Sequence, residues 1–126
     1  MPIFLTAILS ISAFADEGSA VIGGVEMASE EKSAAFEQVR ERLGKWEGTM
    51  ISGATGAVFD VTYELKLTSG GNTIIETLVE DGVEMLTTYS DDNGELVARH
   101  YCALGTEPVF TVSGLSGMVM SVELDN

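Results

Sequence analysis

Apolar and polar residues alternate without a break over residues 59–68. Alternation with a period of two is typical of a β-strand that buries one of its faces. Glycine-containing pairs that favour tight turns then recur about every twelve residues, at Gly70-Gly71, Asp81-Gly82 and Asn93-Gly94. The pattern predicts consecutive antiparallel hairpins, with seven candidate strands in all.

These turns also predict which residues face each other across the strands. If each turn is a two-residue loop, counting outward places Leu65 opposite Glu76. The same count places Thr87 between Glu76 and His100 on the same face. We call this surface the inner face, and its predicted members are Phe59, Val61, Tyr63, Leu65, Leu67, Ile74, Glu76, Leu78, Met85, Thr87, Tyr89, Leu96, Ala98, His100 and Cys102.

The opposite, outer face is more polar and is suited to contact with water. Its predicted members include Glu64, Lys66, Thr77, Glu84, Thr88 and Arg99. An antiparallel meander with one apolar face closes most naturally into a barrel, because closure removes the strand edges. We therefore predict a mainly β protein with an up-and-down antiparallel barrel.

A helical pattern precedes the strands. Ser29 can cap a helix that runs to about Leu43, and Gly44 can supply a left-handed C-cap. The apolar residues that share one stripe of this helix are Ala35, Phe36, Val39 and Leu43. We expect the helix to cover or plug the sheet.

The N-terminus has the features of an export signal. An apolar run over residues 3–15 is too short for a transmembrane helix and ends in the small-x-small triplet of residues 13–15. We predict a signal peptide over 1–15, a flexible leader over 16–28, and a folded domain over 29–126. The mature protein is then periplasmic or secreted. The alternative is a buried N-terminal strand or helix.

The charge balance excludes several classes of partner. Twenty acidic residues face six basic ones, and the net charge is −14. Nucleic acids and anionic membrane surfaces attract clustered Lys and Arg, so we expect neither nucleic-acid binding nor membrane insertion after signal cleavage. Cys102 is the single cysteine, so no intramolecular disulfide forms, and we predict no structural metal site.

Two segments resemble a known family. The Gly44-Lys45-Trp46-Glu47-Gly48 segment, directly after a helix, resembles the Gly-x-Trp entry of lipocalin-like (calycin) barrels. The segment from His100 to Pro108 is similar to the His-Tyr-Cys segment of exported, functionally uncharacterised bacterial lipocalin-like proteins, which often have Asn and Gln where this chain has Thr106 and Glu107. Members of that group usually contain more strands, so the resemblance implies a barrel that is incomplete or C-terminally truncated here.

The resemblance also bears on structural residues and cofactors. It implies structural roles for Gly44, Trp46 and Gly48, with Trp46 plugging the core beside the helix. More distantly, nitrobindin-like barrels bind haem through a histidine on a late strand, and His100 is the only histidine of this chain. We predict no cofactor, and haem ligated by His100 is the alternative.

Glu76, Thr87 and His100 form one predicted cross-strand row. A strand spacing of about 4.8 Å places the backbones of Glu76 and His100 about 10 Å apart, so their side chains can meet over Thr87 or share a ligand. The row either lines a ligand pocket, supplies an acid–base pair, or is a buried pair whose members satisfy each other. The predicted ligand-binding residues are Tyr63, Glu76, Met85, Thr87, Tyr89, His100 and Cys102.

Cys102 is also a candidate nucleophile beside His100. However, next-but-one neighbours on a strand lie about 6.5–7 Å apart, which is too far for a direct thiol–imidazole hydrogen bond. We interpret Cys102 as a small buried apolar residue. A metal site built on His100 and Cys102 needs a third ligand, and Glu76 is the only inward candidate.

The predicted function is the binding of a small, partly apolar molecule inside the barrel of an exported protein. One alternative is a small enzyme that uses Glu76 and His100 as an acid–base pair. Another is an interaction module whose final strand, over residues 118–124, pairs with a partner chain or with a second copy as a homodimer. We expect a binding protein rather than an enzyme.

Overall fold

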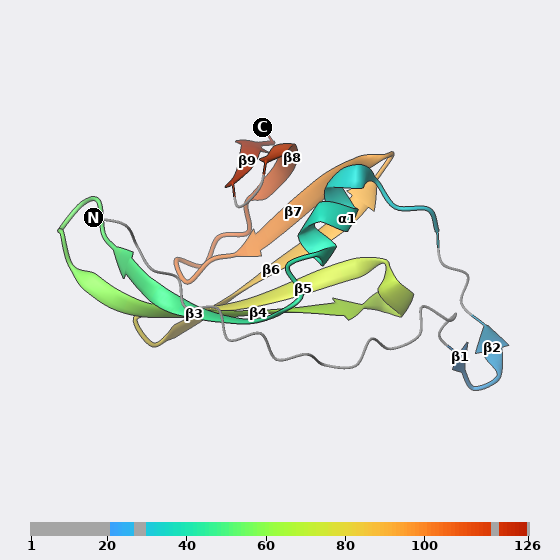
Figure 1. Cartoon of the computed structure of the whole chain (residues 1–126), viewed down its shortest axis with the longest axis horizontal. Coiled ribbons are helices and arrows are strands. Elements are labelled where there is room, and N and C mark those ends of the chain that lie inside the picture. The colour runs from blue at the N-terminus through green and yellow to red at the C-terminus, as the bar shows by residue number, and fades with distance from the viewer. Residues whose placement is uncertain (1–20, 27–29, 117–118, 126) are drawn as a thin grey trace.

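A seven-stranded antiparallel sheet dominates the molecule. The computed structural model describes residues 21–26, 30–116 and 119–125. In these segments every strand of the large sheet pairs with its neighbours in sequence, and the sheet curls into a half-barrel with helix α1 (Ala34–Arg40) against its concave side (Figure 1). The predicted mainly β antiparallel meander is confirmed.

The strands of the half-barrel follow the predicted turns. They are β3 (Gly44–Ile51), β4 (Val58–Thr68), β5 (Thr73–Glu80), β6 (Val83–Asp92), β7 (Glu95–Tyr101), β8 (Val109–Ser116) and β9 (Val119–Leu124). Asp81-Gly82 and Asn93-Gly94 form two-residue turns in which all four residues have positive φ. This conformation matches the twist of the paired strands and is favourable for glycine at the second position.

The first predicted turn is longer than expected. It is the loop Ser69–Asn72, which includes the 3₁₀ turn η1 (Ser69–Gly71). The loop is centred on the same two glycines, so the register of β4 against β5 is unchanged. Leu65 pairs with Glu76, and the same row continues through Thr87 to His100. The register predicted from the three turns is confirmed.

The hydrophobic core lies between α1 and the inner face of the sheet. Its buried members are Phe36, Val39, Leu65, Ile74, Tyr89, Leu96 and Ala98. Burying Phe36 and Val39 stabilises the docked helix by about 1.5–3 kcal/mol each. The short helix covers only part of the inner face, and Leu67 on β4 remains 37% exposed.

Helix α1 begins later than predicted. Ser29 lies outside the described residues, and Ser33 is the N-cap, because its Oγ accepts a hydrogen bond from the backbone N–H of Phe36 at 3.0 Å. The carboxylate of Asp91 in turn accepts hydrogen bonds from the backbone N–H and the Oγ of Ser33 at 2.7 and 2.6 Å. A contact with a distant strand therefore selects where the helix starts.

The end of α1 also differs from the prediction. The backbone N–H groups of Arg42 and Leu43 donate to the carbonyls of Val39 and Arg40, at 2.9 and 3.1 Å. These tighter bonds satisfy carbonyl groups that a left-handed glycine cap would otherwise serve. The predicted C-cap at Gly44 is wrong, because this residue, with φ of 126°, is the first residue of β3.

The half-barrel is open among the described strands. β3 and β9 are its two edges, and the sheet order contains no pairing between them. A β-bulge between Val112 and Gly114 shifts the register of β8 against β9. The bulge bends the last hairpin relative to the rest of the sheet.

Part of the predicted leader forms a small hairpin. β1 (Val21–Ile22) and β2 (Val25–Glu26) pair around Gly23-Gly24, whose φ values of 57° and 84° suit a tight turn. All residues of this hairpin are exposed. The predicted signal peptide over 1–15 lies outside the described residues.

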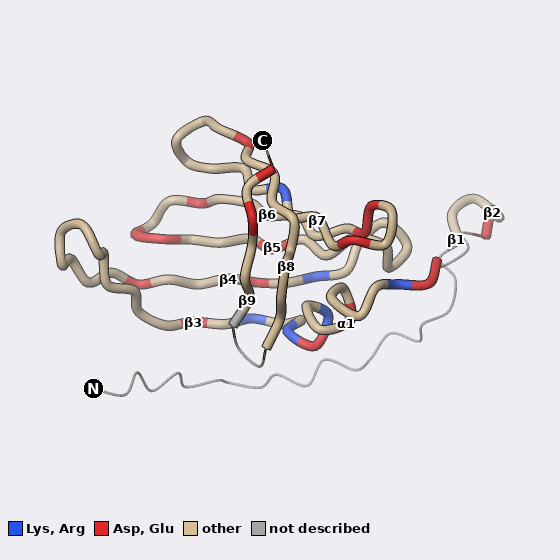
Figure 2. The backbone as a smooth tube through the Cα atoms, turned by 90° about the horizontal axis from the view of Figure 1, so that it is seen from above, with Lys and Arg blue, Asp and Glu red and all other residues tan. Residues whose placement is uncertain are grey.

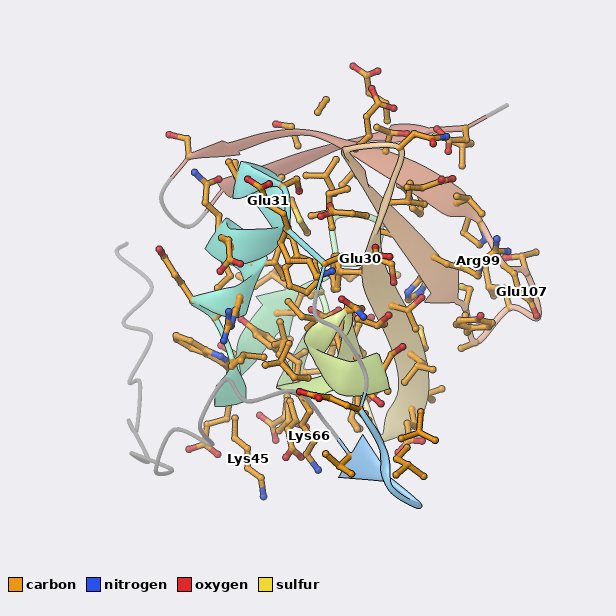
Figure 3. All side chains as sticks on the ribbon, turned by 90° about the vertical axis from the view of Figure 1, so that its right-hand side faces the viewer. Glu30, Glu31, Lys45, Lys66, Arg99 and Glu107 are labelled. Atoms are coloured by element: carbon orange, nitrogen blue, oxygen red, sulfur yellow. The ribbon has the colours of Figure 1, made fainter. Side chains whose placement is uncertain are left out.

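Charged residues are distributed unevenly over the molecule. Figure 2 shows basic residues gathered around α1 and the neighbouring parts of β3 and β4, whereas acidic residues mark the hairpin ends. In Figure 3 the labelled side chains of Lys45, Lys66, Arg99 and Glu107 extend from the periphery of the molecule. The helix of the described part is not long and apolar enough to cross a membrane.

Candidate functional site

A cavity of about 130 Å³ lies between α1 and the inner face of the half-barrel. Its walls come from the helix and its C-terminal end, from four consecutive strands, β3 to β6, and from β9. The lining residues are Val39, Arg42, Trp46, Tyr63, Leu65, Glu76, Tyr89 and Met120. Apolar and aromatic side chains thus enclose a small number of polar groups, which is the usual composition of a small-molecule site.

Glu76 is the acidic group of the cavity. Burial raises the pKa of this carboxyl above its usual value, because a charged group is disfavoured away from water. Hydrogen bonds with the Tyr89 and Thr87 hydroxyls and electrostatic interactions with His100 and Arg42 oppose this rise only in part. The net rise in pKa means that these interactions do not fully offset the loss of hydration of the charged carboxyl.

Tyr89 holds the Glu76 carboxylate from the neighbouring strand. Its hydroxyl donates a hydrogen bond to Oε2 of Glu76 at 3.3 Å, and the residue is 3% exposed. Burial and the adjacent carboxylate both raise the pKa of the Tyr89 hydroxyl. The phenol therefore keeps its proton and acts as a hydrogen-bond donor.

The predicted row of Glu76, Thr87 and His100 is a connected hydrogen-bond chain. Thr87 is 6% exposed, and its Oγ1 lies 2.9 Å from Nδ1 of His100. Which of these two atoms donates depends on the tautomer of the imidazole, and the Thr87 hydroxyl also interacts with the Glu76 carboxyl. The two side chains therefore meet over Thr87, as the register predicts.

Trp46 closes one side of the cavity. Its indole Nε1–H donates to the backbone carbonyl of Arg42 at 2.8 Å, just after the end of α1. Its ring stacks with that of Tyr63, with ring centroids 6.4 Å apart and planes inclined by 20°. The position beside the helix agrees with the predicted plug. Gly48, two residues further along β3, pairs with Val61 and is not among the lining residues.

The predicted ligand-binding residues divide into two groups. Tyr63, Glu76 and Tyr89 line the cavity, and Thr87 lies behind Glu76. His100 is not among the lining residues and is joined to Thr87 by a hydrogen bond. The remaining two predicted residues, Met85 on β6 and Cys102 just after β7, are not among the lining residues. The division follows the helix, which encloses only one end of the inner face.

The segment from His100 to Pro108 comprises the last two residues of β7 and the connection to β8. The backbone N–H of His100 donates to the Pro108 carbonyl at 3.0 Å, and that of Cys102 donates to the Thr106 carbonyl at 2.9 Å. Cys102 is partly buried and its thiol is free. Among the described residues, no group of three or more His, Cys, Asp or Glu side chains is arranged to hold a metal ion.

Several residues of the cavity were not expected from the sequence. Arg42 falls within the predicted helix, but α1 ends at Arg40. The sequence therefore does not indicate that Arg42 lines the cavity. Met120 reaches the cavity from β9, where it pairs with Leu115 beyond the β-bulge. Val39 and Leu65 were expected in the core or on the inner face, and here they form the apolar part of the wall.

The chain finds no match among protein-family models, among curated proteins or among solved structures. The resemblance to lipocalin-like barrels therefore stays a prediction from sequence. The function is therefore inferred from the residues that line the cavity and from its volume.

Proposed function

We propose that this protein binds a small, partly apolar molecule in the cavity of its half-barrel. The observation that carries the proposal is the composition of the wall, in which apolar side chains such as Leu65 and Met120 lie together with the Glu76 carboxylate and the buried Tyr89 hydroxyl. A carboxylate that is partly removed from water costs stability, and groups with raised pKa values cluster at functional sites. Glu76 is such a group, since burial raises its pKa.

The size of the cavity limits the ligand. Typical pockets for drug-sized molecules and cofactors measure about 300–1,000 Å³, whereas this cavity has about 130 Å³. An apolar cavity of about 150 Å³ is known to take up benzene. The volume therefore favours an occupant with a single ring over a lipid or haem.

Binding is better supported than catalysis. An acid–base pair must reach the substrate, yet His100 is joined to Thr87 through Nδ1 and does not line the cavity. Glu76 is the only member of the predicted pair that lines it. The imidazole instead supports the carboxylate through a hydroxyl, which is a positioning role.

Filling the cavity provides the test. Phenol and benzene, added to the whole protein, should raise the unfolding temperature in a concentration-dependent manner. Met120→Trp places a larger side chain in the wall and should abolish the shift, while Ser121→Trp, on the exposed side of the same strand, should preserve it. Unfolding temperatures unaffected by any single-ring probe would contradict the proposal.

We further propose that the protein is exported and related to lipocalin-like barrels. The half-barrel with a helix against its concave side supports this relation. Expression of the full chain followed by N-terminal sequencing of the exported product tests it, and the mature chain should begin at Asp16. A product that retains residues 1–15 inside the cell contradicts export.

A second candidate function is self-association through a strand edge. β3 and β9 are the edges of the described sheet, and Val122 and Leu124 on β9 are 43% and 55% exposed. A second copy that pairs there should give a dimer whose fraction increases with concentration. Size-exclusion chromatography over a hundredfold concentration range distinguishes this from a monomer.

A further inference from the structure

We infer that the occupant of the cavity is a neutral, single-ring molecule that donates an O–H or N–H hydrogen bond to the Glu76 carboxylate. This inference rests on the proposed function and names the chemical class of its ligand. It follows from the charges, the hydrogen-bonding capacity and the shape of the wall.

The charges of the wall disfavour ionic ligands of either sign. Arg42 and Glu76 both line the cavity. The guanidinium therefore repels an organic cation, and the carboxylate repels an organic anion. The volume of about 130 Å³ leaves no room for a charged group to keep its hydration shell beside a ring. The net charge of −14 further opposes the entry of anions. A neutral ligand avoids all three costs.

The Glu76 carboxylate has the capacity to accept a hydrogen bond from a ligand. The indole N–H of Trp46 is engaged with the Arg42 carbonyl, and the Tyr89 hydroxyl donates to Glu76. An ionised carboxylate has about four lone-pair sites. The Tyr89 and Thr87 hydroxyls account for two of the hydrogen bonds to Glu76. A ligand O–H or N–H can therefore still be accepted at Glu76.

The apolar part of the wall is suited to a flat ring. Trp46 and Tyr63 lie nearly parallel, with 20° between their planes, and Leu65 and Met120 also line the cavity. Rings of ligands stack favourably on such aromatic surfaces. Since the volume matches a single ring, phenol is a suitable probe and a fused two-ring molecule is too large.

A probe series on the unmodified protein tests the class directly. Phenol, benzene, benzoate, benzylamine and 2-naphthol are titrated at pH 7 and followed by NMR chemical shifts of the protein amides. We expect phenol to bind at least tenfold more tightly than benzene, benzoate and benzylamine, and 2-naphthol to cause no saturable shift. Tightest binding by benzoate or benzylamine, or equal binding of phenol and benzene, overturns the inference.

Substitutions test whether the Glu76 carboxylate causes the preference for phenol over benzene. Glu76→Gln weakens the acceptor and should reduce the ratio of phenol to benzene affinity at least threefold, whereas Glu84→Gln, at an exposed position of β6, should leave the ratio unchanged. If Glu76→Gln does not fold, Glu76→Asp withdraws the carboxylate by one methylene group and should lower the same ratio. An unchanged ratio in a folded Glu76→Gln or Glu76→Asp protein contradicts the inference.

The failure of the inference and that of the proposed function give different results. If benzene and phenol bind equally and Met120→Trp blocks both, the cavity is a binding site but Glu76 does not select the ligand. If no probe binds to the unmodified protein, the proposed function itself is wrong.

Discussion

Ser33 and Asp91 connect the helix to the sheet. The Asp91 carboxylate on β6 accepts two short hydrogen bonds from Ser33, which itself caps α1 through the backbone N–H of Phe36. Helix α1 has seven residues, and isolated helices of that length are unstable in water. The helix therefore depends on its anchors, and the cavity depends on the helix that forms one of its walls.

Replacement of Asp91 should destabilise the protein through this anchor. Asp91→Ala removes both acceptors of Ser33, and hydrogen bonds to charged groups contribute about 1.5–3 kcal/mol each, so we expect a loss of about 2 kcal/mol or more in the free energy of unfolding. Urea denaturation followed by circular dichroism measures it. Asp92→Ala, at the exposed neighbouring position, is the control. Equal effects of the two variants would show that the anchor is not important.

The strand register was predictable because independent local signals agree. Alternation over residues 59–68 identifies the buried face, and the turns at Asp81-Gly82 and Asn93-Gly94 leave a single way to count residues across the strands. A shift by one residue would turn the whole inner face outward. For this reason the sequence places Glu76 and His100 in one row, and they occupy this row in the structure.

The cavity could be predicted only in part, because it depends on contacts between distant segments. Ser29 and Ser33 are both suitable N-caps, and Asp91, 58 residues further along the chain, selects Ser33. The early end of α1 brings Arg42 into the wall. Met120 lines the cavity from the part of β9 that pairs beyond the β-bulge, and no local pattern in the sequence indicates this bulge. Long-range contacts of this kind have no periodic signature.

Trp46 should stabilise the end of the helix through one specific hydrogen bond. Trp46→Phe keeps an aromatic ring next to Tyr63 but removes the Nε1–H that donates to the Arg42 carbonyl. We expect a loss of about 1 kcal/mol from the hydrogen bond, together with the smaller area of the ring. Thermal unfolding followed by circular dichroism provides the measurement. The control is Tyr101→Phe, at an exposed position of β7. No difference in stability would indicate that water replaces the indole as the donor.

Gly82 should be required for its backbone conformation alone. It has φ of 78° in the turn between β5 and β6, and a Cβ there would contact nothing within 4 Å. Gly82→Ala should therefore cost about 1–2 kcal/mol through the left-handed conformation. Gly53→Ala is a matched control, because this glycine also has open space but no left-handed φ. Urea denaturation should show the loss only for Gly82→Ala, and a loss in both variants would point to another cause.

Glu76 should make the stability of the fold depend on pH. Burial raises its pKa in the folded state above the ordinary value of 4.5, so folding favours the protonated carboxyl. Its contribution to stability is therefore fully present below about pH 4.5 and is lost as the pH rises through the folded-state pKa. Glu76→Gln keeps a neutral group of the same shape, and it should be more stable than the unmodified protein at pH 7.

The difference in unfolding free energy between Glu76→Gln and the unmodified protein should shrink as the pH falls toward 4.5, the pKa of an ordinary glutamate carboxyl. Urea denaturation at several pH values between 4 and 8 measures it, with Glu84→Gln as the exposed control. A stabilising effect at neutral pH would mean that the chain keeps a carboxylate at a cost in stability, as a binding residue does. A destabilising effect that is the same at every pH would instead identify Glu76 as a structural partner of Tyr89 and Thr87.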